Sequence, residues 1–293
     1  MWRFLCLRAD PLAALQRQGR HREKPRPRRG FFVPKKCYIV LVKKRLVVGN
    51  WKMYITQADD ARDFALALRR KTRGLSGVDV LLAPPHTLIP AVEEVLESSS
   101  IRVGAQAISA YADEKHTGDI SGAMLKDAGA SFAIIGHSER RAAGESDALV
   151  REELLRAVEA GLTPILCIGE KERTRDADHF SYVEEQLNSA LKDMPKNSLK
   201  KLIIAYEPVW AIGKSAADAM KPSDVHEMTI FIRKMLTELL DRKMALRTPV
   251  LYGGSVEPGN AVELLKEGGV AGFLVGHASA DVDSFVAIIK ACK

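Results

Sequence analysis

Eight short apolar runs alternate with eight amphipathic segments along residues 46–293, and this rhythm restricts the fold more than any other feature. The runs are Leu46–Lys52, Val78–Ala83, Ile101–Ala107, Phe132–Gly136, Thr163–Ile168, Leu202–Tyr206, Pro249–Tyr252 and Gly272–Val275. Most are continuously apolar, which is typical of parallel strands covered on both faces. Each run is therefore predicted to be a buried strand.

The segments between the runs have the 3.6-residue apolar period of helices. They are Ala58–Arg70, Leu88–Glu97, Gly122–Ala128, Asp147–Ala160, Tyr182–Asp193, Ser223–Asp241, Gly259–Glu267 and Val282–Lys290. Eight strand–helix units in about 250 residues predict an α/β fold, a single (β/α)8 barrel of the TIM-barrel type. A doubly wound open sheet is the main alternative, but it would need a G-x-G-x-x-G turn where this chain has Gly49-Asn50-Trp51-Lys52.

The positive charge of the chain is concentrated near its N-terminus. The whole chain carries +7, and residues 1–45 contain 14 Lys and Arg against 2 acids, which leaves −5 for residues 46–293. We expect residues 1–45 to be a basic, disordered extension and residues 46–293 to be the catalytic barrel domain. A phosphate site in the barrel must then depend on local groups.

Three interpretations of the extension are open. Organellar transit peptides are Arg-rich and acid-poor but usually also Ser-rich, and residues 1–45 contain neither Ser nor Thr. Basic arms also bind nucleic acids or membrane surfaces. We favour a non-functional extension, for instance translation from a start upstream of the true one, and expect no nucleic-acid partner.

Cysteine spacing and apolar run length bear on the compartment. Cys6, Cys37, Cys167 and Cys292 lie far apart and lack zinc-type spacing, so a reducing compartment, the cytoplasm, is expected. Charged residues or glycines interrupt every apolar run before the roughly 18 residues that a membrane span needs. No membrane association is therefore expected.

Polar side chains stand directly after three of the predicted strands. Asn50 and Lys52 end the first run, His137 and Glu139 follow the fourth, and Glu207 follows the sixth. Because the carboxyl ends of all strands in a parallel barrel meet at one mouth, we expect these side chains to gather there as candidate catalytic groups.

Two further features point to the same mouth. The segment after Glu207, Pro208-Val209-Trp210-Ala211-Ile212-Gly213, is apolar although it is a loop, which predicts a lid over a cavity. Tyr252-Gly253-Gly254-Ser255-Val256 and Val275-Gly276-His277 offer backbone N–H groups at the place where such barrels bind phosphate.

Four motifs in their order make residues 46–293 resemble the triosephosphate isomerase family. They are Gly-Asn-Trp-Lys-Met, Gly-His-Ser-Glu-Arg-Arg, Tyr-Glu-Pro-Val-Trp-Ala-Ile-Gly and Tyr-Gly-Gly-Ser-Val. The resemblance implies interconversion of dihydroxyacetone phosphate and D-glyceraldehyde 3-phosphate through an enediolate, with no metal or organic cofactor. The family is a standard example of tuned acid–base groups beneath a closing lid.

The resemblance also implies a role for each of the polar residues. Glu207 would be the base, neutral His137 would polarise the carbonyl, and Lys52 would offset the substrate and enediolate charge. Asn50 would orient the substrate, and Glu139 would support Lys52.

The resemblance further implies a phosphate site. Backbone groups of Gly213, Ser255, Gly276 and His277 would hold the phosphate. Cys167 matches a family cysteine near the base, although a buried packing residue fits its apolar surroundings equally well.

The chain departs from the family pattern at three places. Lys214-Ser215-Ala216-Ala217-Asp218 replaces the usual Thr-Gly-Lys after the lid, and His277 replaces a second glycine, which would cost about 1–2 kcal/mol if its φ had to be positive. In the loop that inserts into a partner subunit in the family, Thr117-Gly118 is present, but the Asn usual after Gln106 is missing and Asp119 replaces Glu. A homodimer through the loop around Thr117 is still expected.

Two other functions remain as alternatives. A different phosphate-binding barrel, such as an aldolase or an indole-forming synthase, is one, but a Schiff-base aldolase would need a lysine where this chain has Glu207. The other is a barrel retained as a scaffold whose tail recruits nucleic acid. That alternative predicts loss of the reactive residues, yet Lys52, His137 and Glu207 are all present.

Overall fold

The computed structural model describes residues 44–173, 178–213 and 219–293. The chain divides into two units, Met1–Ile39 and Val40–Lys293, and only the second contains described residues. The expected disordered extension therefore lies outside the described residues except for Lys44 and Arg45, and so does the divergent segment Lys214–Asp218.

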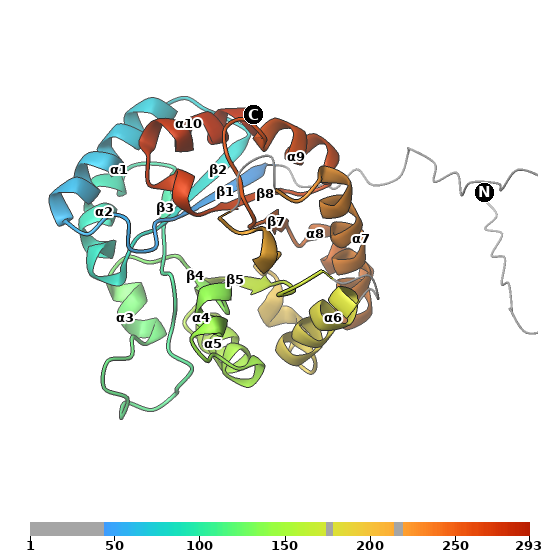
Figure 1. Cartoon of the computed structure of the whole chain (residues 1–293). Helices are drawn as coiled ribbons and strands as arrows, with labels where there is room; N and C mark the ends of the chain where they lie inside the picture. The colour runs from blue at the N-terminus through green and yellow to red at the C-terminus, as the bar shows by residue number, and fades with distance from the viewer. Residues whose placement is uncertain (1–43, 174–177, 214–218) are drawn as a thin grey trace, which may run out of the picture. The chain divides into compact units, whose positions relative to one another are not determined.

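Eight parallel strands form the barrel, in the order β3-β2-β1-β8-β7-β6-β5-β4 (Figure 1). They are β1 (Arg45–Asn50), β2 (Val78–Ala83), β3 (Arg102–Val103), β4 (Phe132–Ile135), β5 (Thr163–Ile168), β6 (Ile203–Tyr206), β7 (Val250–Tyr252) and β8 (Gly272–Val275). The two ends of this order meet at a parallel bridge between Ala105 and Ala133, where Ala105 N donates to Phe132 O over 2.9 Å. The predicted (β/α)8 barrel is confirmed.

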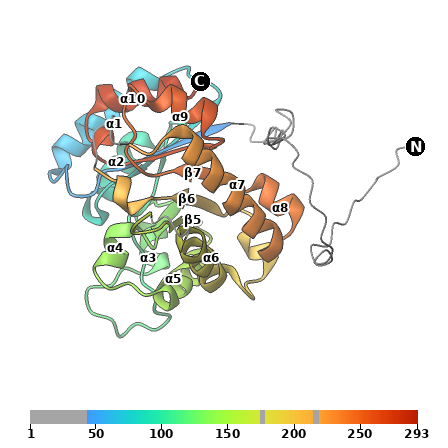
Figure 2. The same ribbon diagram turned by 45° about the vertical axis from the view of Figure 1, so that its right-hand side comes forward.

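Helices form the outer layer around the strands in both ribbon views (Figures 1 and 2). The α-helices are α1 (Ala58–Thr72), α2 (Ile89–Leu96), α3 (Gly122–Asp127), α4 (Ser138–Ala142), α5 (Asp147–Glu159), α6 (Asp178–Leu191), α7 (Pro222–Leu239), α8 (Arg242–Arg247), α9 (Ala261–Glu267) and α10 (Val282–Ala291). Short 3-10 turns are η1 (His86–Leu88), η2 (Lys196–Leu199), η3 (Val209–Ala211) and η4 (His277–Ser279). Over the described residues, no helix has the length and apolar character required to cross a membrane.

Strand alternation divides the apolar core into two clusters. Leu46 and Val48 of β1 pack with Ile165 of β5 in one buried cluster, whereas Val47 packs with the residues of the helices in the other. Successive side chains of a strand point to opposite faces, so the first cluster fills the barrel and the second joins the barrel to its helices. This double coverage explains why the strands are continuously apolar in sequence.

A further helix, α8, follows the helix expected over Ser223–Asp241. The expected helix is α7, and it ends because Leu240 leaves the helical conformation with φ −103° and ψ −90°. The Asp241 side chain then accepts a hydrogen bond from Met244 N over 2.8 Å and caps the start of α8. An N-cap of this kind competes with continuation of the preceding helix.

The third strand is shorter than expected. The run Ile101–Ala107 was predicted as a strand, but β3 covers only Arg102–Val103, followed by the single bridge at Ala105. Gly104 lies against Phe132, where a Cβ atom would come within 2.4 Å of the ring. The short helix α4 was not predicted, because five residues with two arginines and a glutamate show no apolar period.

Candidate active site

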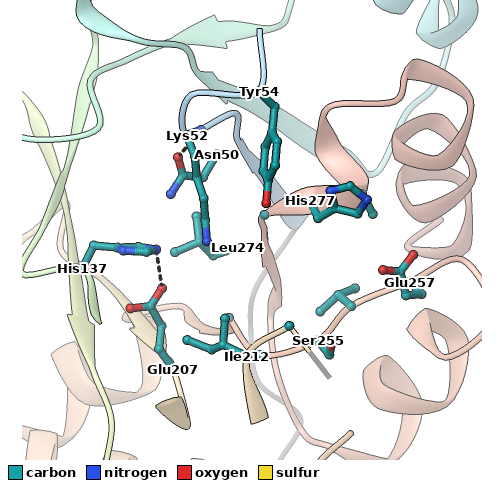
Figure 3. A pocket seen from close by; sticks show the side chains of 16 residues that line it. Asn50, Lys52, Tyr54, His137, Glu207, Ile212, Ser255, Glu257, Leu274 and His277 are labelled. Carbon is teal, nitrogen blue, oxygen red and sulfur yellow. Dashed lines mark hydrogen bonds and ion pairs between the residues drawn. The ribbon is translucent and has the colours of Figure 1, made fainter. Parts of the chain in front are cut away.

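A cavity of about 500 Å³ opens at the carboxyl end of the barrel strands (Figure 3). Its lining includes every residue predicted to react with or bind the substrate: Asn50, Lys52, His137, Glu207, Gly213, Ser255, Gly276 and His277. These residues come from segments that are distant in sequence and that the barrel brings to one mouth. Glu139 and Cys167 do not line this cavity, but Glu139 contacts Lys52 and Cys167 lies close enough to Glu207 to be affected by its charge.

Glu207 and His137 face each other at one end of the cavity (Figure 3). Glu207 Oε1 lies 3.2 Å from His137 Nε2, and Glu207 Oε2 accepts a hydrogen bond from Ser138 N over 3.0 Å. The two residues are only 2% and 6% exposed. A buried carboxylate held by two donors is fixed in position and shielded from bulk water, as a base for carbon acids needs to be.

The hydrogen bonds of His137 define its protonation. Its Nδ1 accepts from Glu139 N over 3.2 Å, so that the ring caps the start of α4. A nitrogen that accepts a backbone N–H carries no proton, which places the proton of a neutral ring on Nε2. The N–H donor of His137 therefore points to Glu207 and to the cavity.

Lys52 reaches the cavity through an unusual backbone conformation. Its φ is +46°, and Asn50 Oδ1 accepts from Lys52 N over 3.1 Å while Gln106 Nε2 donates to Lys52 O over 2.9 Å. Its ammonium contacts Glu139 Oε1 at 2.6 Å. A left-handed conformation at a non-glycine residue costs about 1–3 kcal/mol and is retained where the surroundings enforce it, which is often at functional sites.

Two glycines make room for Glu207. A Cβ atom on Gly169 would lie 1.9 Å from the backbone oxygen of Glu207, and one on Gly253 would lie 2.9 Å from its Cγ atom. Only glycine allows such close approach, so the segments after β5 and β7 both fix the position of this side chain.

The lid segment that follows Glu207 is fixed at its start by a buried carboxylate. Glu170 accepts from the indole Nε1 of Trp210 over 2.9 Å and from the hydroxyl of Tyr206 over 2.9 Å. Burial, reinforced by the neighbouring Glu170, raises the pKa of Tyr206, so that this hydroxyl stays a donor. Ile212, further along the segment, lines the cavity.

The other end of the cavity is formed by the segments after β1, β7 and β8. Ser255, Gly276, His277 and Tyr54 line it. His277 is not among the described non-glycine residues with positive φ, which are Lys52 and Asp193. His277 therefore avoids the cost of about 1–2 kcal/mol that a positive φ would bring, and an L-residue fits the backbone there.

Cys167 does not line the cavity. It borders a second hollow of about 390 Å³, which Ser138, Val209 and Glu207 also line. Burial, and then the charge of Glu207, raises the pKa of the Cys167 thiol well above its usual value. A thiol in this state is inert at neutral pH, which favours packing over a catalytic role. Among the described residues, no group of three or more His, Cys, Asp and Glu side chains could hold a metal ion.

Sequence reasoning missed several residues of the site. Tyr54 and Glu257 line the cavity, the backbone of Ser138 holds Glu207, and Gln106 holds the backbone of Lys52. Tyr54 stands two residues after Lys52, which was a usable signal. The functions of Ser138 and Gln106 depend on tertiary contacts, for which the sequence offers no local pattern.

A parallel barrel with a carboxylate, an imidazole and an ammonium around one cavity defines a (β/α)8-barrel enzyme of the acid–base type. A sequence model of the family "Triosephosphate isomerase" matches residues 45–292. The chain belongs to the triosephosphate isomerase family.

Individual relatives agree with this assignment. The triosephosphate isomerase of Carboxydothermus hydrogenoformans is 41% identical over 252 residues, which cover 85% of this chain and 99% of that protein. The enzyme of Thermus thermophilus is 41% identical over 253 residues, with the same two coverages. The crystal structure of triosephosphate isomerase from Bartonella henselae has a TM-score of 0.75 and 35% identity, covering 85% of this chain and 98% of that one.

Proposed function

We propose that this protein interconverts dihydroxyacetone phosphate and D-glyceraldehyde 3-phosphate, with Glu207, His137 and Lys52 as its catalytic residues. The observation that carries the proposal is the 3.2 Å approach of Glu207 Oε1 to His137 Nε2 inside a cavity that Lys52 also lines. A base and an electrophile beside one small substrate are what enolisation requires.

Each reactive group has one task in the proposed reaction. Glu207 takes the proton from C1 of dihydroxyacetone phosphate while the C1–H electron pair forms the C1–C2 double bond and the carbonyl oxygen becomes an oxyanion. The Nε2–H of His137 and the ammonium of Lys52 stabilise that oxygen. After His137 has moved a proton between the two oxygens, Glu207 returns its proton to C2, so that no atom is gained or lost.

The base must turn before it can act. Both oxygens of Glu207 are engaged by His137 and Ser138 in this conformation. We propose that closure of the segment Pro208–Gly213 turns the carboxylate from Ser138 to the substrate. The Trp210–Glu170 hydrogen bond at the start of this segment is the contact that closure would change.

The phosphate is assigned to the end of the cavity formed by Gly213, Ser255, Gly276 and His277, which we call the phosphate end. Backbone N–H groups in loops and glycines without side chains suit an oxyanion. Lys52 adds a positive charge beside it, since a Cβ atom on Gly276 would lie 3.4 Å from Lys52 Cε.

A coupled assay with glyceraldehyde 3-phosphate tests the proposal. Glu207→Gln removes the base without changing the shape of the side chain, and kcat is expected to fall by at least about a thousandfold, the size of a lost proton-transfer step. Glu207→Asp moves the carboxylate back from the substrate but keeps it, so its kcat is expected to fall less. Unchanged turnover in Glu207→Gln would defeat the mechanism.

We also propose a homodimer through the segment between β3 and α3. Both ribbon views show this segment extending away from the barrel, with Thr117 in its course (Figures 1 and 2). Tyr111 within it is 45% exposed and Met53 beside the cavity is 81% exposed, and a partner would cover such apolar groups. Light scattering should report twice the chain mass, and Thr117→Arg should shift the protein toward monomer. A monomeric wild-type protein at micromolar concentration would contradict the dimer.

A cytoplasmic location completes the proposal. The free thiols Cys167 and Cys292 are buried and unbridged, which suits a reducing compartment. A chain that starts near Lys44 is expected to equal the full chain in activity and in RNA or DNA retention. Organellar import of the full chain would contradict the proposed location, and nucleic-acid retention by the full chain alone would assign the extension a partner.

A further inference from the structure

Tyr54 and His277 contact each other at the phosphate end of the cavity. Their ring centroids lie 5.2 Å apart at an interplanar angle of 70°, and both residues line the cavity. Figure 3 shows them across the cavity from His137 and Glu207. Neither ring takes part in the acid–base site described above.

Barrel closure brings these two residues together. Tyr54 follows β1 and His277 follows β8, and these strands pair in parallel with Gly49 opposite Val275. The two loops therefore leave the barrel side by side. Because Gly276 also lies close to the Lys52 side chain, the pair stands where the ammonium and the backbone cradle meet.

The polar atoms of the pair are available to a ligand. Among the described residues, neither the Tyr54 hydroxyl nor a ring nitrogen of His277 has a hydrogen-bond partner. Tyr54 is 51% exposed, and His277 is exposed too, so neither side chain is needed to fill the core. Both side chains line the cavity, so their donors can serve a ligand that binds there.

A second Tyr–His pair in the protein differs in whether its histidine already has a partner. Tyr111 and His116 stack flat, with centroids 3.5 Å apart and an interplanar angle of 4°. His116 Nε2 also contacts Asp113 Oδ2 at 3.3 Å, so the edge of that ring is engaged. Among the described residues, no partner of this kind engages the Tyr54 hydroxyl or the ring nitrogens of His277.

We propose that the Tyr54 hydroxyl and a ring N–H of His277 donate hydrogen bonds to the phosphate group of the substrate. The inference rests on the proposed function and extends its phosphate site from backbone groups to two side chains. A phenol and an imidazole each offer a donor, and the terminal oxygens of a phosphate monoester accept several. The ligand class is a phosphate monoester dianion.

Tyr54 and His277 lie outside the segment Pro208–Gly213 that is proposed to close, so their contacts with the unreacting phosphate should be the same before and during the reaction. Interactions of equal strength in substrate and transition state change KM and leave kcat unaltered. The pair therefore has a kinetic signature that a merely structural pair would not have. The same contacts should hold inorganic phosphate, which needs no catalysis to be detected.

The experiment uses the full-length protein with Tyr54→Phe, His277→Ala and His277→Gln. Calorimetry measures the Kd of inorganic phosphate, and the coupled assay measures KM and kcat with glyceraldehyde 3-phosphate. Tyr54→Phe and His277→Ala are each expected to raise Kd and KM about tenfold, as loss of a hydrogen bond to a charged group does, without change in kcat. His277→Gln keeps an N–H donor and should recover part of the affinity.

His226→Ala is the matched control, because His226 is an exposed histidine on α7 that does not line the cavity. It should leave Kd, KM and kcat unchanged. Phosphate affinity within twofold of wild type in both Tyr54→Phe and His277→Ala would overturn the inference, and so would a fall in kcat with KM and Kd unchanged. A wild-type protein that binds phosphate but does not isomerise would defeat the proposed function, while the calorimetry would still decide this inference.

Discussion

The two ends of the cavity hold their ligand-facing groups in opposite ways. At the reacting end, Glu207 and His137 are buried, and each is hydrogen-bonded to protein. At the phosphate end, Tyr54 and His277 are exposed and have free polar atoms within the described part of the chain.

The difference fits the task that we propose for each end. Proton transfer depends on reacting atoms placed to within a fraction of an ångström and shielded from water. Phosphate recognition requires only donors directed at a group that stays unchanged. Substitutions at the reacting end should therefore lower kcat, and those at the phosphate end should change KM.

Lys52 stands between the two ends, and its removal should have the largest effect. Lys52→Met keeps the length of the side chain and removes the charge that faces both the oxyanion and the phosphate. We expect kcat/KM to fall about a thousandfold or more, with both constants affected. Lys44→Met is the control, since Lys44 forms a comparable pair with Asp79 at 3.0 Å but does not line the cavity. Equal losses in the two variants would show that charge alone, and not position, matters.

A single added methyl group at the reacting end should rank next. In Gly253→Ala the new Cβ atom would lie 2.9 Å from Glu207 Cγ, so the base must move. We expect kcat to fall about a hundredfold while KM stays close to that of wild type. Thermal unfolding of the same sample checks that the barrel is intact. If kcat equals that of wild type, the reacting end tolerates displacement of Glu207, and the proposed difference in precision between the two ends is wrong.

Removal of a negative charge at the phosphate end should improve substrate binding slightly, in contrast to the losses expected above. Glu257 lines the cavity, as His277 does, and its negative charge would repel a phosphate bound there. Glu257→Gln should lower KM about twofold at low ionic strength and leave kcat unchanged, because a solvated charge acts only weakly over such distances. A raised KM would indicate that Glu257 orients a donor instead.

The smallest effect on activity is expected at Glu153, which lies outside both ends. Burial, reinforced by the charge of Glu145, raises its pKa to about 8. Between the ordinary glutamate pKa of 4.5 and this value, the folded state keeps a proton that the unfolded state has lost. The stability from this group is thus complete below pH 4.5 and declines, by up to about 1.4 kcal/mol per pH unit, as the pH rises toward 8.

Urea unfolding of Glu153→Gln against wild type, from pH 5 to pH 8, measures this decline. The variant should gain stability relative to wild type as the pH rises, with kcat and KM unchanged. A stability difference that does not vary with pH would show that Glu153 ionises normally in the folded protein.

The sequence predicts the strands best where apolar runs are continuous. β2, β5 and β8 have the bounds expected from the sequence, because buried parallel strands leave an unmistakable apolar run. The polar residues at strand ends could be placed at one mouth for the same reason. The contact of Tyr54 with His277 could not be predicted, because it arises from the pairing of β1 with β8 and not from any local pattern.

Local chemistry that competes with periodicity accounts for the other differences. α4 begins at Ser138, directly after His137, whose ring serves as its cap, and no apolar period marks this helix. α8 was not predicted either, because its six residues are too few to show an apolar period, and its start depends on the side-chain cap of Asp241.

The junction between β3 and β4 is where the barrel should open locally most easily. β1 and β2 are joined over six residue pairs, whereas the segments of β3 and β4 are joined by one bridge at Ala105 and three backbone hydrogen bonds. The amide of Ala105 should therefore exchange its hydrogen for deuterium sooner than the amides of β1, since a short ladder opens at lower free energy. A partner subunit bound to the loop that follows β3 would stabilise the junction between β3 and β4 and slow the exchange.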